Sequence, residues 1–195
     1  MEWHAAIGIL SGVLQIGSII PYARSIVWGT TRPNAVSTGL WTLLSGIALA
    51  AQISAGASWS VILVAGITFN CALITVLALT GYGYAKYGPL DWFCLLMGLA
   101  ALGAWALTSN PVIAIILAVI ASFASNIPTV VKTYREPHSE HPFSWSLVVL
   151  ASTLALLSTT QLDAANLLYP AEDWVLNIII FSLAFFRQRK GTGGT

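Results

Sequence analysis

The sequence predicts an all-α membrane protein with seven transmembrane helices. Of its 195 residues, 57% are hydrophobic and only 8% are charged, and the mean hydropathy is +0.81. A soluble domain carries about 25% charged residues, because a polar shell must surround its core. The net charge of +1 also argues against a nucleic-acid partner. The composition therefore excludes most soluble enzymes and favours a polytopic membrane protein.

The number of long apolar segments is the second observation. A helix needs about 20 mostly apolar residues to cross a bilayer. Seven such segments occur, at residues 5–27, 36–55, 59–80, 90–108, 111–132, 143–162 and 168–187. No positively charged region precedes the first segment, so we expect a retained span rather than a cleaved signal peptide. The segments leave only short loops, with a flexible tail expected at 191–195.

The distribution of charge is the third observation. With seven spans, every basic residue falls on one side of the membrane: Arg24, Arg32, Lys86, Lys132, Arg135, Arg187, Arg189 and Lys190. The positive-inside rule then predicts an external N-terminus and a cytoplasmic C-terminus. We expect Asp163, Glu172 and Asp173 to form an acidic external loop. Because no charged residue is then expected at mid-membrane, the sequence predicts passive exchange rather than proton-coupled transport.

The chain also contains an internal repeat. A shift of 107 residues, without gaps, aligns Pro21 with Pro128 and Asn70 with Asn177, together with three pairs of serines. The shift relates the first three spans to the last three and leaves the fourth without a partner. Because one extra crossing restores the orientation, we predict two parallel three-helix bundles joined by a linker helix, a 3+1+3 layout.

The predicted boundaries of this layout follow from the spans. They are 1–83 for the first bundle, 84–109 for the linker helix and 110–190 for the second bundle. Transporters built from such repeats bind their substrate near the seam between them.

Polar residues and prolines within the spans are the candidate functional residues. We expect Pro21 and Pro128 to act as paired hinges of a cytoplasmic gate, because a proline kinks a helix. Asn70 and Asn177 are mid-span, where an amide must face protein or water, and their donors and acceptors suit a neutral, hydroxyl-rich solute. Further candidates for contact with the solute are Asn126, Gln15, Trp41 and Trp145. The alternative role for these side chains is packing between helices.

The stretch from Ile20 to Ser37 resembles the motif of PQ-loop proteins. A proline lies near the end of the first helix, basic residues follow, and a serine opens the second helix; Pro128 to Ser144 repeats this pattern. With the 3+1+3 layout, nearly the whole chain resembles the superfamily of SWEET sugar transporters, PQ-loop transporters and KDEL receptors.

The resemblance implies that Asn70 and Asn177 match the asparagines that line the SWEET sugar pocket. The chain departs from the family pattern at four positions: Tyr22 and Thr129 replace a glutamine, and Leu40 and Leu147 replace prolines of SWEETs.

The sequence therefore predicts a facilitative transporter of a small neutral polar solute, with sugars as one candidate class. Two alternatives stay open: a vitamin-precursor transporter of the PnuC type, which would use aromatic stacking, and a KDEL-receptor-like peptide receptor, which needs basic residues in its cavity. We expect no enzymatic activity, cofactor or metal site, because no nucleophile–base group, phosphate loop or metal-ligand spacing occurs. The solute and the lipid bilayer are the expected partners, and homo-oligomerisation is left open.

Overall fold

The computed structural model describes residues 2–191, and this part of the chain is helical without a strand. The elements are α1 (Glu2–Val27), α2 (Ala35–Ser54), α3 (Val61–Leu77) with the π-helical turn η1 (Ala78–Tyr82), α4 (Pro89–Thr108), α5 (Pro111–Arg135), the 3-10 turn η2 (Pro137–Ser139), α6 (Pro142–Ser158) and α7 (Ala164–Gly191). Six of these helical segments are long and apolar enough to cross a membrane, and α6, with 17 residues, is a shorter apolar helix. The prediction of an all-α, multi-pass membrane protein is confirmed.

Local sequence explains where the helices begin. Asn34 caps α2 and Asn110 caps α5, because each side-chain oxygen accepts a hydrogen bond from the backbone N–H two residues later, at 3.1 and 3.0 Å. Prolines occupy the first position of α4, α5 and α6, where a missing N–H costs nothing. The predicted tail, 191–195, lies outside the described residues except for Gly191, which ends α7, and the side chains of Arg189 and Lys190 lie outside them as well.

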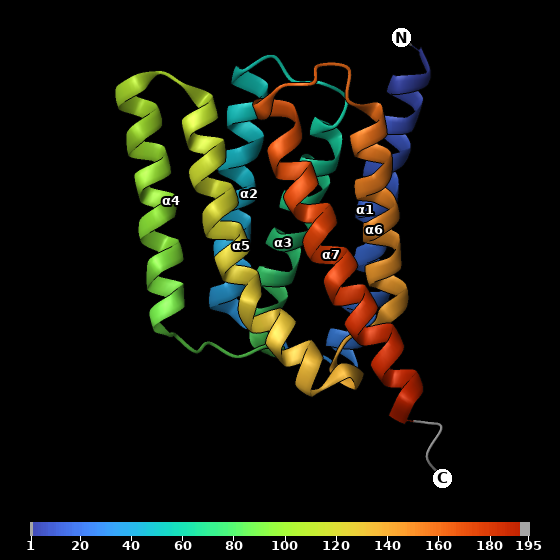
Figure 1. Cartoon of the computed structure of the whole chain (residues 1–195). Coiled ribbons are helices and arrows are strands. Elements are labelled where there is room, and N and C mark those ends of the chain that lie inside the picture. Colours follow the sequence, from blue (N-terminus) through green and yellow to red (C-terminus); the bar gives the residue numbers. More distant parts are fainter. Residues whose placement is uncertain (1, 192–195) are drawn as a thin grey trace.

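The helices form one bundle with the termini at opposite ends (Figure 1). In the first part of the chain, α3 packs against both α1 and α2; in the last part, α7 packs against both α5 and α6. These two groups meet along two interfaces, where α1 packs against α6 and α2 against α5. Helix α4 lies outside, against α5 and α2.

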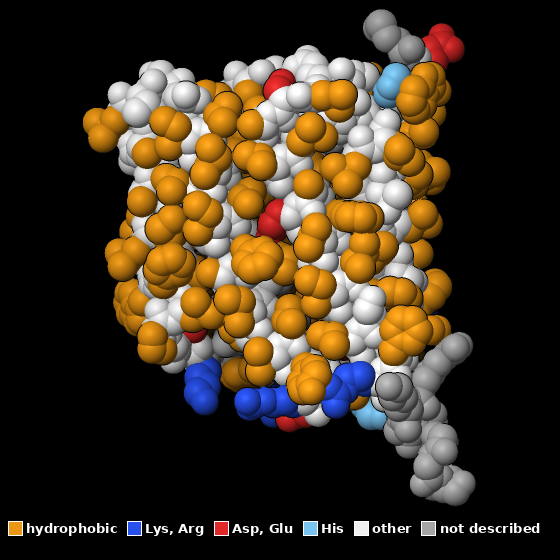
Figure 2. Space-filling model, in the orientation of Figure 1, with side chains coloured by type: hydrophobic (Ala, Val, Ile, Leu, Met, Phe, Trp, Pro, Cys, Tyr) orange, Lys and Arg blue, Asp and Glu red, His pale blue; other side chains and the backbone are white. Residues whose placement is uncertain are grey.

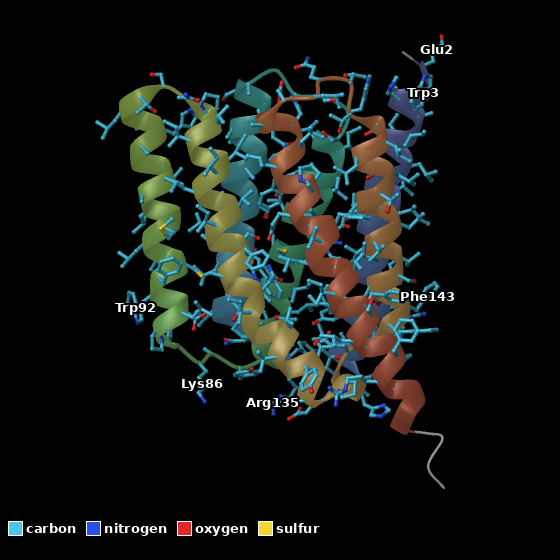
Figure 3. The ribbon with its side chains drawn as sticks, in the orientation of Figure 1. Glu2, Trp3, Lys86, Trp92, Arg135 and Phe143 are labelled. Carbon is cyan, nitrogen blue, oxygen red and sulfur yellow. The ribbon has the colours of Figure 1, made fainter. Side chains whose placement is uncertain are left out.

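Charged and apolar side chains separate along the bundle axis. Figure 2 shows hydrophobic side chains over the flank of the molecule and the visible Lys and Arg side chains at the end where α7 finishes. Lys86 and Arg135 lie at this basic end, and Glu2 lies at the opposite end (Figure 3). An apolar belt between polar ends is the arrangement that a bilayer requires.

Helix α7 differs from the prediction in a way that matters for function. It begins at Ala164, so that Glu172 and Asp173 lie more than two turns inside it and not in an external loop. The helix starts early because the Asp163 side chain accepts a hydrogen bond from the Asn166 N–H at 2.9 Å. Pro170 is tolerated within it, since the Asn166 carbonyl, which the proline cannot bond, accepts one from Ser60 at 3.3 Å. The prediction that ionisable residues occur only at the ends of the spans is therefore wrong.

Candidate functional site

A cavity of about 120 Å³ lies among the helices of the first and last groups. This volume has room for several water molecules. Every helix except α4 contributes to its wall. The lining residues are Gln15, Ser18, Ile19 and Tyr22 of α1, Trp41 of α2, Ile67, Asn70, Cys71 and Ile74 of α3, Ser122 and Asn126 of α5, Ser144, Trp145 and Val148 of α6, and Tyr169, Glu172, Asp173, Leu176 and Asn177 of α7.

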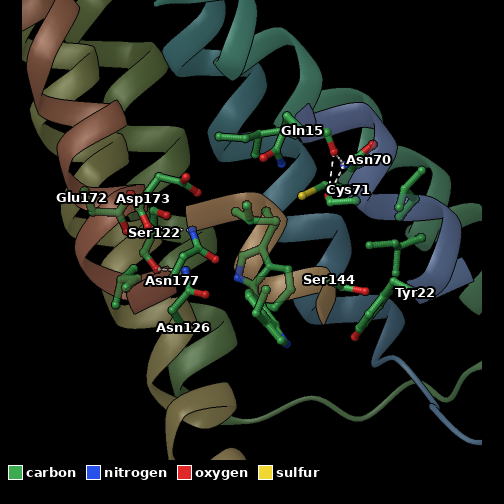
Figure 4. Close-up of a pocket in the computed structure, with 18 of the residues that line it drawn as sticks. Gln15, Tyr22, Asn70, Cys71, Ser122, Asn126, Ser144, Glu172, Asp173 and Asn177 are labelled. Carbon is green, nitrogen blue, oxygen red and sulfur yellow. Dashed lines mark hydrogen bonds between the residues drawn. The ribbon is translucent and has the colours of Figure 1, made fainter. Parts of the chain in front are cut away.

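All six residues that the sequence singled out for contact with a solute line this one cavity: Asn70, Asn177, Asn126, Gln15, Trp41 and Trp145. Figure 4 shows Gln15 and Asn70 on one side of it, and Asn126 and Asn177 on the other. The tertiary fold thus brings together residues that lie up to 162 positions apart in the sequence. Pro21 and Pro128 do not line the cavity and lie within α1 and α5.

The first wall of the cavity is held by a bond between two helices. The Asn70 amide donates to the Gln15 backbone carbonyl at 2.5 Å and approaches the Ser18 hydroxyl at 3.4 Å, which ties α3 to α1. The Ser18 hydroxyl donates to the same carbonyl at 2.6 Å. The side-chain oxygens of Gln15 and Asn70 remain buried without a hydrogen-bond partner.

The second wall carries the two acidic residues. The Ser152 hydroxyl of α6 donates to Asp173 Oδ2 at 2.5 Å, and the Asn177 amide donates to the Asp173 backbone carbonyl at 2.6 Å. Glu172 Oε1 is buried without a hydrogen-bond partner. Figure 2 also shows acidic atoms within the apolar belt, away from both charged ends. None of the lining residues is Lys, Arg or His, so this wall has no basic counter-charge.

Asn126 lies two residues before Pro128, which leaves the carbonyl of residue 124 without its helical hydrogen bond. The Asn126 amide instead donates to the carbonyl of Ser122, at 2.9 Å, and the side chain also lines the cavity.

The two tryptophans connect the cavity to other parts of the bundle. Trp41 Nε1 donates to the Ser125 hydroxyl at 2.9 Å, across the interface between α2 and α5. Trp145 Nε1 donates to the carboxylate of Glu140 at 3.0 Å, and the same carboxylate forms an ion pair with Lys132 at 2.9 Å. Because both indole N–H groups are bonded elsewhere, the tryptophans offer ring surface rather than donors to the cavity.

Sequence reasoning missed several lining residues, above all Glu172 and Asp173. One signal was present. Asp173 stands four residues before Asn177, which places the two side chains on the same face of a helix. Pro170 instead favoured a later helix start, because proline is common at the first position of a helix. Cys71 and Tyr169 gave no signal beyond that of ordinary apolar packing.

Comparisons with known proteins identify no family for this chain. No family model matches the chain, and no significant similarity to a curated protein or to a solved structure was found. The functional argument rests on the cavity and the residues around it.

Proposed function

We propose that this protein is an alternating-access transporter of a small polar solute. The observation that carries the proposal is the polar cavity inside an otherwise apolar bundle, with a wall built from both groups of helices. Polar groups are costly at membrane depth, so a cluster of amides and carboxylates facing one space is typical of a solute pathway. The small volume of the cavity favours a small solute.

We further propose the 3+1+3 layout, with bundles at 1–83 and 110–190 and a linker helix at 84–109. The helix neighbours support it. A shift of 107 residues relates α1, α2 and α3 to α5, α6 and α7, and each set has its third helix in the middle. The same relation exchanges the α1–α6 interface with the α2–α5 interface, as a two-fold axis along the bundle would.

In the proposed mechanism, the two bundles rock against each other around the cavity. Pro21 and Pro128 would flex the ends of α1 and α5 towards the basic end. The contact from Trp145 through Glu140 to Lys132 joins the cavity wall to this end, which suits an inner gate. By the positive-inside rule, the basic end would face the cytoplasm and the N-terminus the outside.

Facilitative exchange of a neutral polar solute, with sugars as one class, is the first substrate hypothesis. The amides of Asn70 and Asn177 from opposite walls, and the rings of Trp41 and Trp145, are chemically suited to hydroxyl-rich molecules.

Uptake of radiolabelled sugars and polyols into proteoliposomes would test this hypothesis, with empty liposomes as the blank. We expect Asn70→Ala and Asn177→Ala each to reduce saturable uptake by about tenfold, in line with the loss of a buried polar contact. Gln161→Ala is the matched control, because Gln161 is an exposed amide outside the cavity. Uptake that both asparagine variants leave unchanged would remove the binding role of these residues.

A vitamin-precursor transporter of the PnuC type is the second candidate, and the two tryptophans in the cavity wall favour it. Nicotinamide riboside uptake that is lost in Trp41→Ala and Trp145→Ala would distinguish it from a sugar transporter. A peptide receptor is less well supported, because it needs a basic residue in the cavity and Lys132 is instead paired with Glu140.

A further inference from the structure

Several of the hydrogen-bond donors that line the cavity are engaged within the protein. Three of the four lining amides each donate to a backbone carbonyl: Asn70 to that of Gln15, Asn126 to that of Ser122 and Asn177 to that of Asp173. The indole donors of Trp41 and Trp145 are bonded outside the cavity. Five N–H donors of the cavity wall therefore already have partners in the protein.

Several hydrogen-bond acceptors of the cavity wall, by contrast, have no partner in the protein. Three side-chain oxygens of the cavity wall are buried without a hydrogen-bond partner: Gln15 Oε1, Asn70 Oδ1 and Glu172 Oε1. Gln15 and Asn70 are each only 5% exposed, so bulk water does not satisfy them. A buried acceptor without a donor costs free energy, and a bound molecule that donates hydrogen bonds would remove this cost.

The charge of the cavity wall is unbalanced in the same direction. Glu172 and Asp173 are adjacent on α7, and none of the lining residues carries a positive charge. The other ionisable groups that face them are the thiol of Cys71 on α3 and the phenols of Tyr169 on α7 and Tyr22 on α1, none of which can become cationic. From α5 and α6, the groups that face them are the hydroxyls of Ser122 and Ser152.

In place of a neutral solute, we propose that the transported solute is a small organic cation with an ammonium group. This inference rests on the proposed transport function and assigns the charge of its solute. The carboxylates of Glu172 and Asp173 neutralise the ammonium group and accept its N–H bonds, and the free oxygens of Gln15 and Asn70 on the other wall accept hydrogen bonds from further donors of the same molecule. The faces of Trp41 and Trp145 favour the same charge, because an aromatic face attracts a cation.

Binding of three matched small molecules tests this proposal without any transport assay. Ethanolamine is a cation with N–H donors, ethylene glycol is its neutral counterpart, and glycolate is an anion of similar size. The full chain, in lipid nanodiscs at pH 7, is heated with increasing concentrations of each molecule, with potassium chloride balancing the ionic strength. A ligand that binds only the folded state raises the unfolding temperature in a saturable manner.

We expect ethanolamine to raise the unfolding temperature and the other two molecules to leave it unchanged. Glu172→Gln and Asp173→Asn, which keep the shape of each side chain, should each weaken the apparent affinity for ethanolamine by about tenfold or more. Glu2→Gln removes one charge outside the cavity and should keep the wild-type affinity. Size-exclusion chromatography shows whether each variant remains folded and monodisperse.

Other results of this binding experiment would overturn the proposal of an organic cation as the solute. Equal stabilisation by ethylene glycol would assign the cavity to neutral polyols, and equal stabilisation by potassium chloride would assign it to an inorganic cation. No stabilisation by any molecule, or an unchanged affinity in both acidic-site variants, would show that the two carboxylates do not bind an ammonium group. Because binding is measured apart from uptake, ethanolamine binding without transport of any solute would instead overturn the transport function.

Discussion

The two groups of helices around the cavity, α1–α3 (the first half) and α5–α7 (the second half), build different walls. In the first half, α1 comes close to α3 and to the turn before it at glycines: a Cβ at Gly8 would lie 2.8 Å from Cβ of Trp59 in that turn, and one at Gly66 of α3 would lie 3.0 Å from Gln15 Cγ. The shift of 107 residues places Ile115 and Asp173 at these positions in the second half. Close backbone approach on one side is thus replaced by side chains, including a carboxylate, on the other.

The exchange of large and small residues shows how this difference arises. In the first half, the long side chain of Gln15 on α1 lies over Gly66 on α3. In the second half, the equivalents are the short Ser122 on α5 and Asp173 on α7. The two pairs have similar total volume, but only the second pair brings an acidic group into the cavity. The helix contacts within the two halves are similar, whereas the chemistry of their cavity walls differs.

The largest effect is expected from filling the close contact of the first half. Gly12 of α1 faces Ile62, and a Cβ at this glycine would overlap the Ile62 side chain. Gly12→Leu should destabilise the folded protein by about 3 kcal/mol, because α1 and α3 must separate. Gly17→Leu in the same helix is the control, since nothing lies within 4 Å of a Cβ there. Thermal unfolding in nanodiscs measures both; equal losses would show that the helices do not meet at Gly12.

The charge of the second wall can be probed through a native cysteine. Cys71 lines the cavity, whereas Cys94 does not, and Cys94→Ser gives a suitable background. A cationic aminoethyl methanethiosulfonate should modify Cys71 at least about tenfold faster than the anionic sulfonatoethyl reagent, because the acidic wall concentrates cations. Mass spectrometry gives both rates. The preference should shrink in Asp173→Asn; a preference for the anionic reagent would contradict an acidic wall.

The two repeat-related asparagines should differ in their contribution to stability. Asn70 bonds a neighbouring helix, whereas Asn177 bonds the carbonyl one turn before it in its own helix. Asn70→Ala should therefore cost about 1 kcal/mol and Asn177→Ala clearly less, as expected for hydrogen bonds between membrane helices. Equilibrium unfolding in mixed micelles measures the two free energies. A larger loss of unfolding free energy in Asn177→Ala than in Asn70→Ala would contradict this difference between the two asparagines.

The smallest effect is expected at the basic end of the bundle. The loop after α1 and the loop after α5 are held there by different interactions. Lys132 forms an ion pair with Glu140, and its repeat equivalent Ser25 donates to the Thr31 hydroxyl at 2.9 Å. Lys132→Met and Ser25→Ala should each cost less than about 1 kcal/mol, since the Lys132 side chain is partly exposed and the buried Glu140 carboxylate keeps its hydrogen bond from Trp145. Only the effect of Lys132→Met should decrease in 1 M salt, because salt screens charges and not neutral hydrogen bonds. Unfolding at two salt concentrations tests the difference.

Much of the fold was predictable because it depends on local sequence. Each of the seven apolar segments corresponds to a helix, since a membrane-spanning segment must satisfy its backbone internally. The match of Asn70 with Asn177 at the 107-residue shift pointed to two residues that line the cavity, because a polar side chain in a long apolar run must face protein or water. The acidic residues of the site were missed because the continuity of α7 through Pro170 depends on a contact across the fold, from Ser60 to the Asn166 carbonyl.

By itself, the sequence determined that the chain is a bundle of apolar helices with its basic residues confined to the ends, because hydropathy and charge are local properties that a bilayer sorts directly. Only the tertiary structure decided which polar groups line the same cavity and which already form hydrogen bonds with neighbouring residues. That assignment placed Glu172 and Asp173 in the cavity wall and left acceptors there without donors. The physical reason is that hydrogen-bond satisfaction depends on side chains that meet only after the helices pack.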